Sequence, residues 1–244
     1  RTFKALCGGE ALRPELAKQL LERTGVLWNM YGPTETTVWS TCCRVDNAAA
    51  VTIGRPIANT TVHVLDDRQQ LLPIGVPGEI WIGGAGVTLG YLNRPELTKE
   101  RFIADEFSTV SNALLYRTGD RGRWRHDGML EHMGRLDFQV KVRGYRIELG
   151  EIESALGTMS GCARAVVIAR EDRAGDVRLV AYVVPQPGAT LAESACKDYL
   201  KSALPDYMIP QHVVLLDAIP LLPNGKVDRK ALPAPMAAAS ASTF

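Results

Sequence analysis

The hydrophobic pattern changes twice along the chain, and this constrains the fold more than any other feature of the sequence. Residues 5–10 are typical of a strand that runs into a loop, Pro14 opens a helix, Thr24-Gly25 ends it, and residues 26–30 form a short buried strand. A strand–helix–strand order predicts an α/β fold. We expect the inward face of the helix to carry Leu16, Leu20 and Leu21.

Residues 51–92 have a different pattern, in which short alternating runs are separated by turn residues. The clearest runs are residues 62–65 and 79–82, and the glycine-rich residues 83–87 follow the second run. The glycine spacing there does not fit a dinucleotide-binding loop, so we interpret it as a tight turn between strands. Asp127-Gly128 predicts a hairpin turn. This part of the chain is therefore expected to be β-rich.

The second change falls near Gly134 and introduces a unit that mixes helices and strands. We predict strands at residues 140–143, 165–169, 179–184 and 213–216, and helices at residues 149–159 and 191–204. The second helix is expected to direct inward the side chains of Cys196, Tyr199, Leu200 and Ala203. The predicted fold class is thus α/β followed by a compact α+β unit. The expected divisions are residues 1–136, residues 137–233 and an Ala/Ser-rich linker at 234–244.

The charges of the 244-residue chain nearly cancel, because 28 Lys and Arg face 27 Asp and Glu. Proteins that coat nucleic acid or an anionic membrane need a large basic excess, so neither partner is expected. The sequence has no run typical of a membrane span and no signal-peptide pattern. Its five Cys and four His are scattered, without metal-ligand spacing. We therefore expect a reduced, cytoplasmic protein whose chemistry relies on neither residue type.

The segment Tyr31-Gly32-Pro33-Thr34-Glu35-Thr36-Thr37 follows the buried strand at residues 26–30. It therefore lies at the carboxyl end of a strand, where α/β sheets bind their ligands. It supplies an aromatic face for a base, a glycine that permits close approach, hydroxyls for phosphate oxygens and one carboxylate for Mg²⁺. The segment fits a nucleotide site, and it equally fits a turn followed by solvated polar residues.

Three further segments each have a functional and an ordinary interpretation. Asp120, at the end of Tyr116-Arg117-Thr118-Gly119-Asp120, offers two acceptor oxygens that suit the hydroxyls of a ribose, or it caps a turn. Lys226 lies in a glycine-hinged loop without P-loop spacing, where it neutralises developing negative charge or is simply solvated. Arg135 fits a contact with ribose or phosphate and Asp137 fits a hinge, or the two belong to an exposed ion-pair network.

These motifs are specific only when they are taken together and in order. The sequence then resembles the adenylation domains of nonribosomal peptide synthetases, within the adenylate-forming superfamily. The resemblance extends from Leu6 to Leu232 and is carried by residues 31–37, 78–98, 116–120, 134–153, 204–210 and 222–232. It implies the C-terminal part of the large adenylate-forming core, with α/β and β-rich subdomains, followed by a complete small α+β lid domain.

The resemblance also implies a reaction. Enzymes of that family convert an amino acid and MgATP into aminoacyl-AMP and pyrophosphate, and then pass the acyl group to the phosphopantetheine thiol of a carrier domain. ATP and Mg²⁺ are the implied cofactors. The implied partners are a carrier domain in the same polypeptide and an adjacent condensation domain. A general base is unnecessary, because the substrate carboxylate is already an anion at neutral pH.

Roles for individual residues follow from the matching positions. Lys226 would bridge the substrate carboxylate and the phosphate in the transition state, and Glu35 would hold Mg²⁺. Asp137 would be the hinge between the two half-reactions, after which Gly144 and Tyr145 enter the site. The implied nucleotide-binding residues are Gly8, Gly9, Glu10, Tyr31, Gly32, Thr34, Asp120 and Arg135. Among these, Tyr31 would stack on adenine, Thr34 would touch the phosphate and Asp120 would accept both ribose hydroxyls.

The same resemblance outlines part of a substrate pocket. The specificity positions of the family correspond to Leu6, Gly8, Met30, Val38 and Trp39, with Lys226 as the constant member. Bulky apolar side chains leave little room in a pocket and offer no charge to a charged substrate. A small amino acid is therefore expected, with glycine first and alanine next; the alternative is that these are ordinary core residues.

The sequence departs from the family pattern at its start. The phosphate loop rich in Gly, Ser and Thr should precede Leu6, and it is absent, as is the aspartate that binds the α-amino group of the substrate. We therefore predict that the chain represents only the C-terminal half of the domain and forms aminoacyl-AMP at no useful rate by itself. Two other interpretations stay open, an acyl-CoA ligase fragment and a non-catalytic piece that docks a carrier domain.

Overall fold

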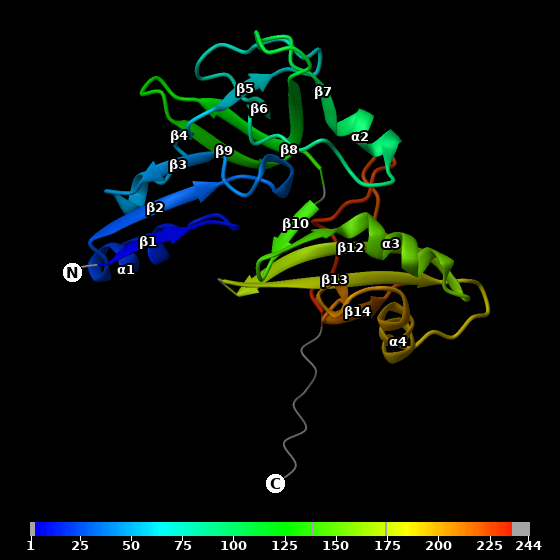
Figure 1. Cartoon of the computed structure of the whole chain (residues 1–244). Helices are drawn as coiled ribbons and strands as arrows, with labels where there is room; N and C mark the ends of the chain where they lie inside the picture. The colour runs from blue at the N-terminus through cyan, green and yellow to red at the C-terminus, as the bar shows by residue number, and fades with distance from the viewer. Residues whose placement is uncertain (1–2, 138, 174, 236–244) are drawn as a thin grey trace. The chain divides into compact units, whose positions relative to one another are not determined.

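The computed structural model describes residues 3–137, 139–173 and 175–235 (Figure 1). The chain divides into two compact units, Arg1–Asp137 and Phe138–Phe244. Each unit has its own sheets and its own clusters of buried apolar side chains. Among the helices in these described ranges, none combines the length and apolar character that crossing a membrane requires.

The first unit begins with a four-stranded sheet in the order β1-β2-β3-β4. The strands are β1 (Lys4–Cys7), β2 (Val26–Tyr31), β3 (Thr41–Arg44) and β4 (Arg55–Pro56). β1 and β2 are parallel and are joined by helix α1 (Pro14–Arg23), which confirms the predicted strand–helix–strand order. Alternate side chains of β2 are buried, so that Leu27, Asn29 and Tyr31 share one face.

Helix α1 ends as predicted, because Thr24 closes its last turn. The backbone N–H and the hydroxyl of Thr24 both donate to the carbonyl oxygen of Leu20, each at 2.9 Å. The predicted inward position of Leu16 is wrong, since this side chain is 48% exposed. Ala17 is fully buried instead, and Leu20 and Leu21 pack beside it. The buried face is therefore built on helical spacing from Ala17.

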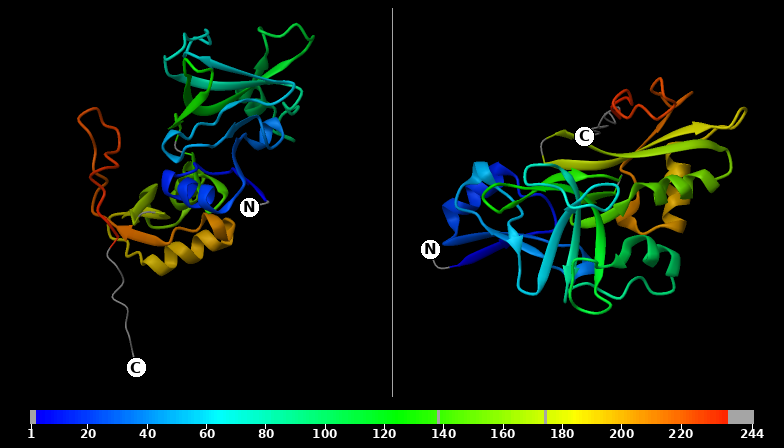
Figure 2. Two further views of the ribbon diagram at one scale, coloured as in Figure 1. Left: turned by 90° about the vertical axis from the view of Figure 1, so that its left-hand side faces the viewer. Right: turned by 90° about the horizontal axis from the view of Figure 1, so that it is seen from above.

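The second sheet of this unit has the order β5-β6-β8-β7, and β9 also pairs with β8; its strands are cyan to green in Figure 2. The elements are β5 (Thr60–Leu65), β6 (Gly78–Gly84), helix α2 (Pro95–Arg101), β7 (Phe102–Ala104), β8 (Leu114–Trp124) and β9 (Leu130–Arg135). The expected β-rich region is confirmed, with Asp127-Gly128 in the turn between β8 and β9. Gly83 and Gly84 still belong to β6, so the turn predicted at residue 83 begins later.

The ladder between β8 and β9 contains an irregularity. Asp120 pairs with Arg135 and Gly122 pairs with His132, so a step of two residues on β8 faces a step of three on β9. Such a β-bulge needs an unusual backbone conformation. Gly134 provides it with φ of +90°, a value that a residue with a side chain rarely adopts.

The second unit combines a hairpin, a three-stranded sheet and two helices. The hairpin strands are β10 (Gln139–Val142) and β11 (Tyr145–Glu148), and the sheet has the order β12-β13-β14. The remaining bounds are helix α3 (Leu149–Thr158), β12 (Cys162–Arg173), β13 (Asp176–Pro185), helix α4 (Glu193–Ala203), the 3₁₀ helix η3 (Asp206–Met208) and β14 (His212–Leu215). Every helix and strand predicted here is present, with ends that differ by a few residues.

Both faces of the three-stranded sheet are covered. Side chains of α3 and α4, among them Ile152, Leu156 and Leu200, pack on one face. The segment after β14, orange to red in Figure 2, contributes Ile219 and Leu232 to the cluster on the other face. Because both faces are buried, the middle of β13 is an unbroken apolar run rather than an alternating one. Cys196 and Leu200 lie inward as predicted and Tyr199 is half-buried, but Ala203 is exposed.

Candidate functional site

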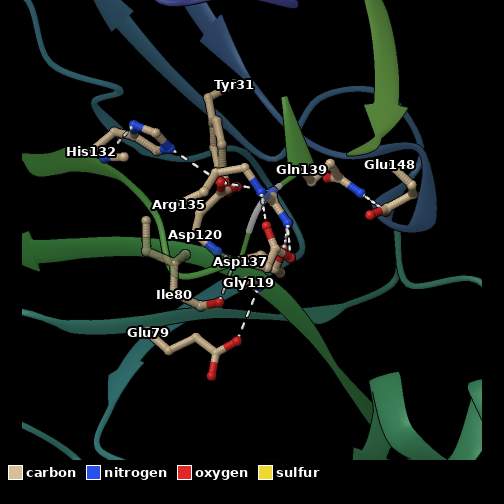
Figure 3. A network of polar contacts seen from close by, with 12 residues as sticks. Tyr31, Glu79, Ile80, Gly119, Asp120, His132, Arg135, Asp137, Gln139 and Glu148 are labelled. Carbon is tan, nitrogen blue, oxygen red and sulfur yellow. Dashed lines mark hydrogen bonds and ion pairs between the residues drawn. The ribbon is translucent and has the colours of Figure 1, made fainter. Parts of the chain in front are cut away.

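The structure brings together two residues that the sequence placed in separate motifs. Tyr31 is the last residue of β2 and Asp120 lies within β8, and the Tyr31 hydroxyl donates to Asp120 Oδ2 at 2.6 Å (Figure 3). Both are buried, with 8% and 6% of their surfaces exposed. Burial raises the pKa of the Tyr31 hydroxyl, and the neighbouring Asp120 carboxylate raises it further. The hydroxyl is therefore a protonated donor at neutral pH.

Asp120 receives two more donors from strand β9. Arg135 Nη1 lies 2.9 Å from Asp120 Oδ1, and His132 Nε2 lies 3.2 Å from the same oxygen. Burial acts to raise the pKa of the Asp120 carboxyl, but the hydrogen bonds from His132 and Tyr31 and the charge of Arg135 outweigh it and lower the pKa. The carboxylate is therefore an anion at neutral pH, held by three donors. The sequence motifs identified Arg135 but not His132.

Arg135 also contacts the residue predicted as the hinge. Its Nε and Nη2 donate to the two carboxylate oxygens of Asp137, each at 2.6 Å, and Nη2 also donates to the Thr118 carbonyl oxygen at 3.1 Å. One planar guanidinium thus joins Asp120 and Asp137, an arrangement suited to its several donors in fixed directions. The alternative drawn from sequence was an exposed ion-pair network. The ion pair between Arg135 and Asp137 is present, but it is not exposed, since 15% and 30% of the two side chains are accessible.

Gly119 is required by this arrangement. Its φ is +73°, and a β-carbon added to it would lie 2.7 Å from both Arg135 Nη2 and Asp137 Oδ2. Any side chain there would displace the ion pair. Gly119 therefore provides the space in which Arg135 and Asp137 meet.

Glu79 supports the same segment from strand β6; it belongs to the motif at residues 78–98, but no role was predicted for it from the sequence. Its Oε1 accepts a hydrogen bond from the Gly119 backbone N–H at 3.0 Å, and both of its oxygens accept from Arg117 Nε at 3.1 and 3.0 Å. Glu79 is buried, so this carboxylate fixes the backbone immediately before Asp120 (Figure 3). A lone acidic residue at the start of the apolar run at 79–82 is the signal that the sequence offers for it.

Glu35, the predicted Mg²⁺ ligand, lies in the 3₁₀ helix η1 (Thr34–Thr36) just after β2. Gly32 permits the backbone to fold back there, because an added β-carbon would lie 2.6 Å from the Val38 carbonyl oxygen. Glu35 is buried, and its Oε1 accepts a hydrogen bond from the Tyr91 hydroxyl at 2.6 Å. Burial raises the pKa of Tyr91, as does the bond to Glu35, so this hydroxyl is a donor too. Thr34 is exposed.

Three of the five predicted pocket positions are in contact. Gly8 directly faces Trp39, since a β-carbon added to Gly8 would overlap the Trp39 ring and lie 2.9 Å from the Met30 carbonyl oxygen. The other two positions, Leu6 and Val38, are 61% and 57% exposed. The alternative that all five are ordinary core residues is therefore wrong, because Leu6, Gly8 and Val38 are exposed and the other two are only partly buried. The neighbouring Gly9 and Glu10 are exposed as well.

The remaining predicted residues belong to the second unit and are described within it. Lys226 is exposed in a tight loop, where Leu222 N–H donates to the Lys226 carbonyl oxygen at 2.8 Å and Gly225 has φ of +78°. Gly144, with φ of +81°, forms the turn of the β10–β11 hairpin, and Tyr145 begins β11. At the other end of that hairpin Gln139 Nε2 donates to Glu148 Oε1 (Figure 3).

Within the described ranges the structure shows no group of three or more His, Cys, Asp and Glu side chains that could hold a metal ion. A single buried carboxylate such as Glu35 still fits Mg²⁺, because this ion usually keeps several waters and takes one or two protein carboxylates plus substrate phosphates.

Comparison with known proteins places the chain in a family. The AMP-binding enzyme family matches residues 1–92, and the AMP-binding enzyme C-terminal domain matches residues 151–226. The chain thus belongs to the AMP-binding enzymes. Within them it is similar to the adenylation domains of nonribosomal peptide synthetases, which confirms the resemblance drawn from its motifs.

Individual relatives make the similarity concrete. The chain is 48% identical to a dimodular nonribosomal peptide synthase of Bacillus subtilis (strain 168) over 237 residues, which are 96% of this chain and 10% of that protein. A solved four-domain nonribosomal peptide synthetase bound to AMP and glycine is 50% identical with a TM-score of 0.54, and the match covers 96% of this chain and 18% of the other.

A further solved structure extends the comparison to a smaller protein. It is a nonribosomal peptide synthetase protein with adenylation and PCP domains, bound to a vinylsulfonamide inhibitor; it is 33% identical with a TM-score of 0.81, over 93% of this chain and 40% of the other. The chain therefore spans a small fraction of the dimodular synthase and less than half of either solved structure.

Proposed function

We propose that the chain is part of an adenylation domain that activates an amino acid for nonribosomal peptide synthesis. A carboxylate oxygen of the amino acid attacks the α-phosphorus of MgATP. A new P–O bond forms, the bond from the α-phosphorus to the oxygen that bridges to the β-phosphate breaks, and pyrophosphate leaves. In the second half-reaction the phosphopantetheine sulfur of a carrier domain attacks the carbonyl carbon of the aminoacyl-AMP, and AMP leaves.

The observation that carries this proposal is the arrangement of Tyr31, Asp120 and Arg135. Tyr31 comes from β2, whereas Asp120 and Arg135 come from the paired strands β8 and β9. The three residues form one hydrogen-bonded group of a buried aromatic ring, a carboxylate and a guanidinium. A nucleoside monophosphate needs those groups: a ring to stack on, an acceptor for ribose hydroxyls and a nearby positive charge. The AMP-binding enzyme match at residues 1–92, which includes Tyr31, supports the same assignment.

Ribose binding at Asp120 has a specific cost in this arrangement. A carboxylate offers about four acceptor positions, and Tyr31, Arg135 and His132 already use three of them. Two ribose hydroxyls therefore need one of the protein bonds to weaken or be replaced. The long 3.2 Å contact of His132 is the weakest of the three, and we assign the exchange to it. Gly8, Gly9, Glu10, Gly32 and Thr34 complete the proposed nucleotide site.

Glu35 is the proposed Mg²⁺ ligand. When bound, the ion offsets the charge of the phosphate oxygens. The protein contributes a buried carboxylate whose direction is fixed by the Tyr91 hydroxyl at 2.6 Å. Such an outer hydrogen bond holds a ligand in place for the metal.

Lys226 is the proposed catalytic residue of the first half-reaction. Two anions meet when the substrate carboxylate approaches the α-phosphate, and a positioned ammonium offsets their repulsion. Lys226 directly follows Gly225, which has positive φ, and its side chain is exposed. The lysine is therefore accessible from solvent in its own unit. Asp137 is the proposed hinge between the half-reactions, and Gly144 and Tyr145 are assigned to the second.

The proposed substrate is glycine or another small amino acid. The contact between Gly8 and Trp39 supports this, because the indole ring fills the space that a larger substrate side chain would need. The similar four-domain synthetase bound to AMP and glycine supports it as well. The proposed partner is a peptidyl carrier domain in the same polypeptide, with a condensation domain beside it, in the cytoplasm. The similar synthetase with adenylation and PCP domains supports the carrier assignment.

The experiment that tests the proposal replaces Lys226 with alanine in the intact parent protein. Amino-acid-dependent exchange of pyrophosphate into ATP should fall by about a hundredfold or more, because the charge that acts in the transition state is lost. Lys230→Ala is the matched control, since Lys230 is an exposed lysine of the same segment. Normal exchange in the Lys226→Ala protein would remove Lys226 from its assigned role. No exchange by the wild-type parent with any amino acid would reject the function itself.

A further inference from the structure

Two exposed tyrosines of the second unit stack face to face. The rings of Tyr145 and Tyr207 have centroids 4.4 Å apart and planes that differ by only 6°. Tyr145 begins β11 directly after the hairpin turn, and Tyr207 lies in η3, more than sixty residues further along the chain. The side chains remain 51% and 42% exposed, so the pair lies on the surface rather than in the core.

Tyr207 is attached to a rigid base. It lies between Asp206, which accepts the Ile209 backbone N–H at 3.1 Å, and Met208, which is buried in the cluster under α3 and α4. The backbone on both sides of Tyr207 is therefore held in place, and Met208 shares its cluster with Val142 and Ile147 of the hairpin.

The strands of the hairpin are anchored in the core, and its turn is exposed. Val142 and Ile147 are buried in the same cluster and anchor β10 and β11. Between them, Arg143 and Gly144 adopt positive φ angles of 52° and 81°, and both are exposed. Tyr145 follows immediately, with half of its surface in solvent. The stack on Tyr207 is a contact that restricts the direction of this ring.

We propose that Tyr207 is a positioning residue for the second half-reaction, because it holds Tyr145 in the orientation in which the Gly144-Tyr145 turn acts. This inference rests on the proposed function, which assigns that turn to transfer of the acyl group to the carrier thiol. Tyr207 takes no part in bond formation. A flat, parallel contact between two rings restricts the rotation of both, and it does so without any polar group.

The ordinary alternative is that the two rings stack only to cover each other's apolar surface. That alternative predicts a loss of stability on substitution and no preference between the half-reactions. The positioning role predicts a difference between them, because Lys226 serves the first and the hairpin turn serves the second. Measuring the rates of both half-reactions in one enzyme therefore distinguishes the two interpretations.

The test uses Tyr207→Ala and Tyr207→Phe in the intact parent protein with its carrier domain. Two rates are measured: amino-acid-dependent ATP–pyrophosphate exchange, and thioester loading of the phosphopantetheinylated carrier domain. Tyr207→Ala should slow loading by about fivefold to tenfold and leave exchange within twofold of wild type, while Tyr207→Phe, which keeps the stacked ring, should restore loading. Tyr199→Ala is the control, since Tyr199 is a half-buried tyrosine of α4 in the same unit, and should change neither rate.

A double-substitution cycle with Tyr145→Ala identifies the path of the effect. If Tyr207 acts through Tyr145, the double variant loads the carrier no more slowly than Tyr145→Ala alone. Independent, multiplicative losses would overturn the proposal, as would unchanged loading in Tyr207→Ala or an equal loss in both half-reactions. If the wild-type parent forms aminoacyl-AMP and its Tyr145→Ala variant loads the carrier at the wild-type rate, the turn has no role in loading. The adenylating function would then still stand.

Discussion

The Tyr31 hydroxyl donates a 2.6 Å hydrogen bond to Asp120 across 89 positions of sequence. Tyr31 ends a strand of the first sheet and Asp120 lies in the longest strand of the second, so this one bond connects both sheets of the first unit. Both partners are buried, so water does not compete strongly for either. The bond therefore has a structural role in addition to any role at the proposed nucleotide site.

Replacing Tyr31 with phenylalanine separates these two roles. The variant keeps the ring proposed to stack on adenine but leaves the buried Asp120 with one donor fewer, so the first unit should lose about 1–3 kcal/mol of stability. In the parent protein the Michaelis constant for ATP should rise, because Asp120 loses one of the three donors that orient it. Unfolding by urea and the ATP dependence of pyrophosphate exchange measure the two effects.

Tyr182→Phe is the matched control. Tyr182 is a fully buried tyrosine of the second unit, and its hydroxyl donates to the Pro233 carbonyl oxygen at 2.6 Å. Its loss should lower stability without changing the Michaelis constant for ATP. Similar constants in Tyr31→Phe and wild type would show that the bond to Asp120 is structural only.

Gly119→Ala should damage the site through the backbone. The added methyl group would lie 2.7 Å from both Arg135 and Asp137, at a residue whose φ of +73° disfavours alanine. We expect a loss of more than about 1 kcal/mol in the free energy of unfolding. Gly150→Ala is the control, because no atom lies within 4 Å of its added methyl and the residue is helical; it should be neutral or slightly stabilising. Equal stability of the two variants would contradict this interpretation of Gly119.

Acid should weaken the first unit partly through Asp120. The folded protein lowers the pKa of this carboxyl, so on acidification the unfolded chain takes up the proton first. The contribution of Asp120 to stability is therefore fully present above the ordinary carboxyl pKa of about 4 and is lost as the pH falls through the lower folded value. The side chain of Asp120→Asn cannot titrate. The difference in the free energy of unfolding between wild type and this variant should therefore shrink as the pH falls from about 6 to about 3. Parallel stability curves for the two proteins would contradict this.

Trp39→Ala should change the amino-acid preference of the parent protein. Removing the indole ring that faces Gly8 opens space in the proposed pocket. A methylene in such a pocket changes discrimination by about tenfold to two-hundredfold. The ratio of specificity constants for glycine over alanine should therefore fall by at least about tenfold. Leu89→Ala, at a highly exposed apolar residue outside the pocket, is the control and should leave the ratio unchanged. An unchanged ratio in Trp39→Ala would place the pocket elsewhere.

The sequence predicted the elements well because their signals are local. Pro14 and Thr24 marked the ends of α1, Asp127-Gly128 marked a hairpin, and helical spacing from Leu149 marked α3. Errors arose where burial depends on distant partners. Leu16 has the same helical spacing as a core residue, yet only the packing of Ala17 against β2 determines which side of the helix is covered.

The candidate site was predicted only in part, for a similar reason. Motif residues such as Asp120 and Arg135 were found, but the partners that hold them were not. His132, Glu79 and Tyr91 lie outside the residues given a role from sequence and reach the site through strand pairing and close packing. Such neighbours are set by register between strands, and register is not visible in the composition of either strand alone.

The bulge between β8 and β9 has a consequence for how this site tolerates change. His132 and Arg135 are separated by an odd number of positions, so in a regular strand their side chains would point to opposite sides of the sheet. The extra residue on β9 reverses that parity and turns both donors toward Asp120. Without this bulge, the same spacing of three positions would leave the carboxylate with one of the two donors. The backbone conformation of this short stretch, with Gly134 at positive φ, thus matters as much as the identity of its charged residues.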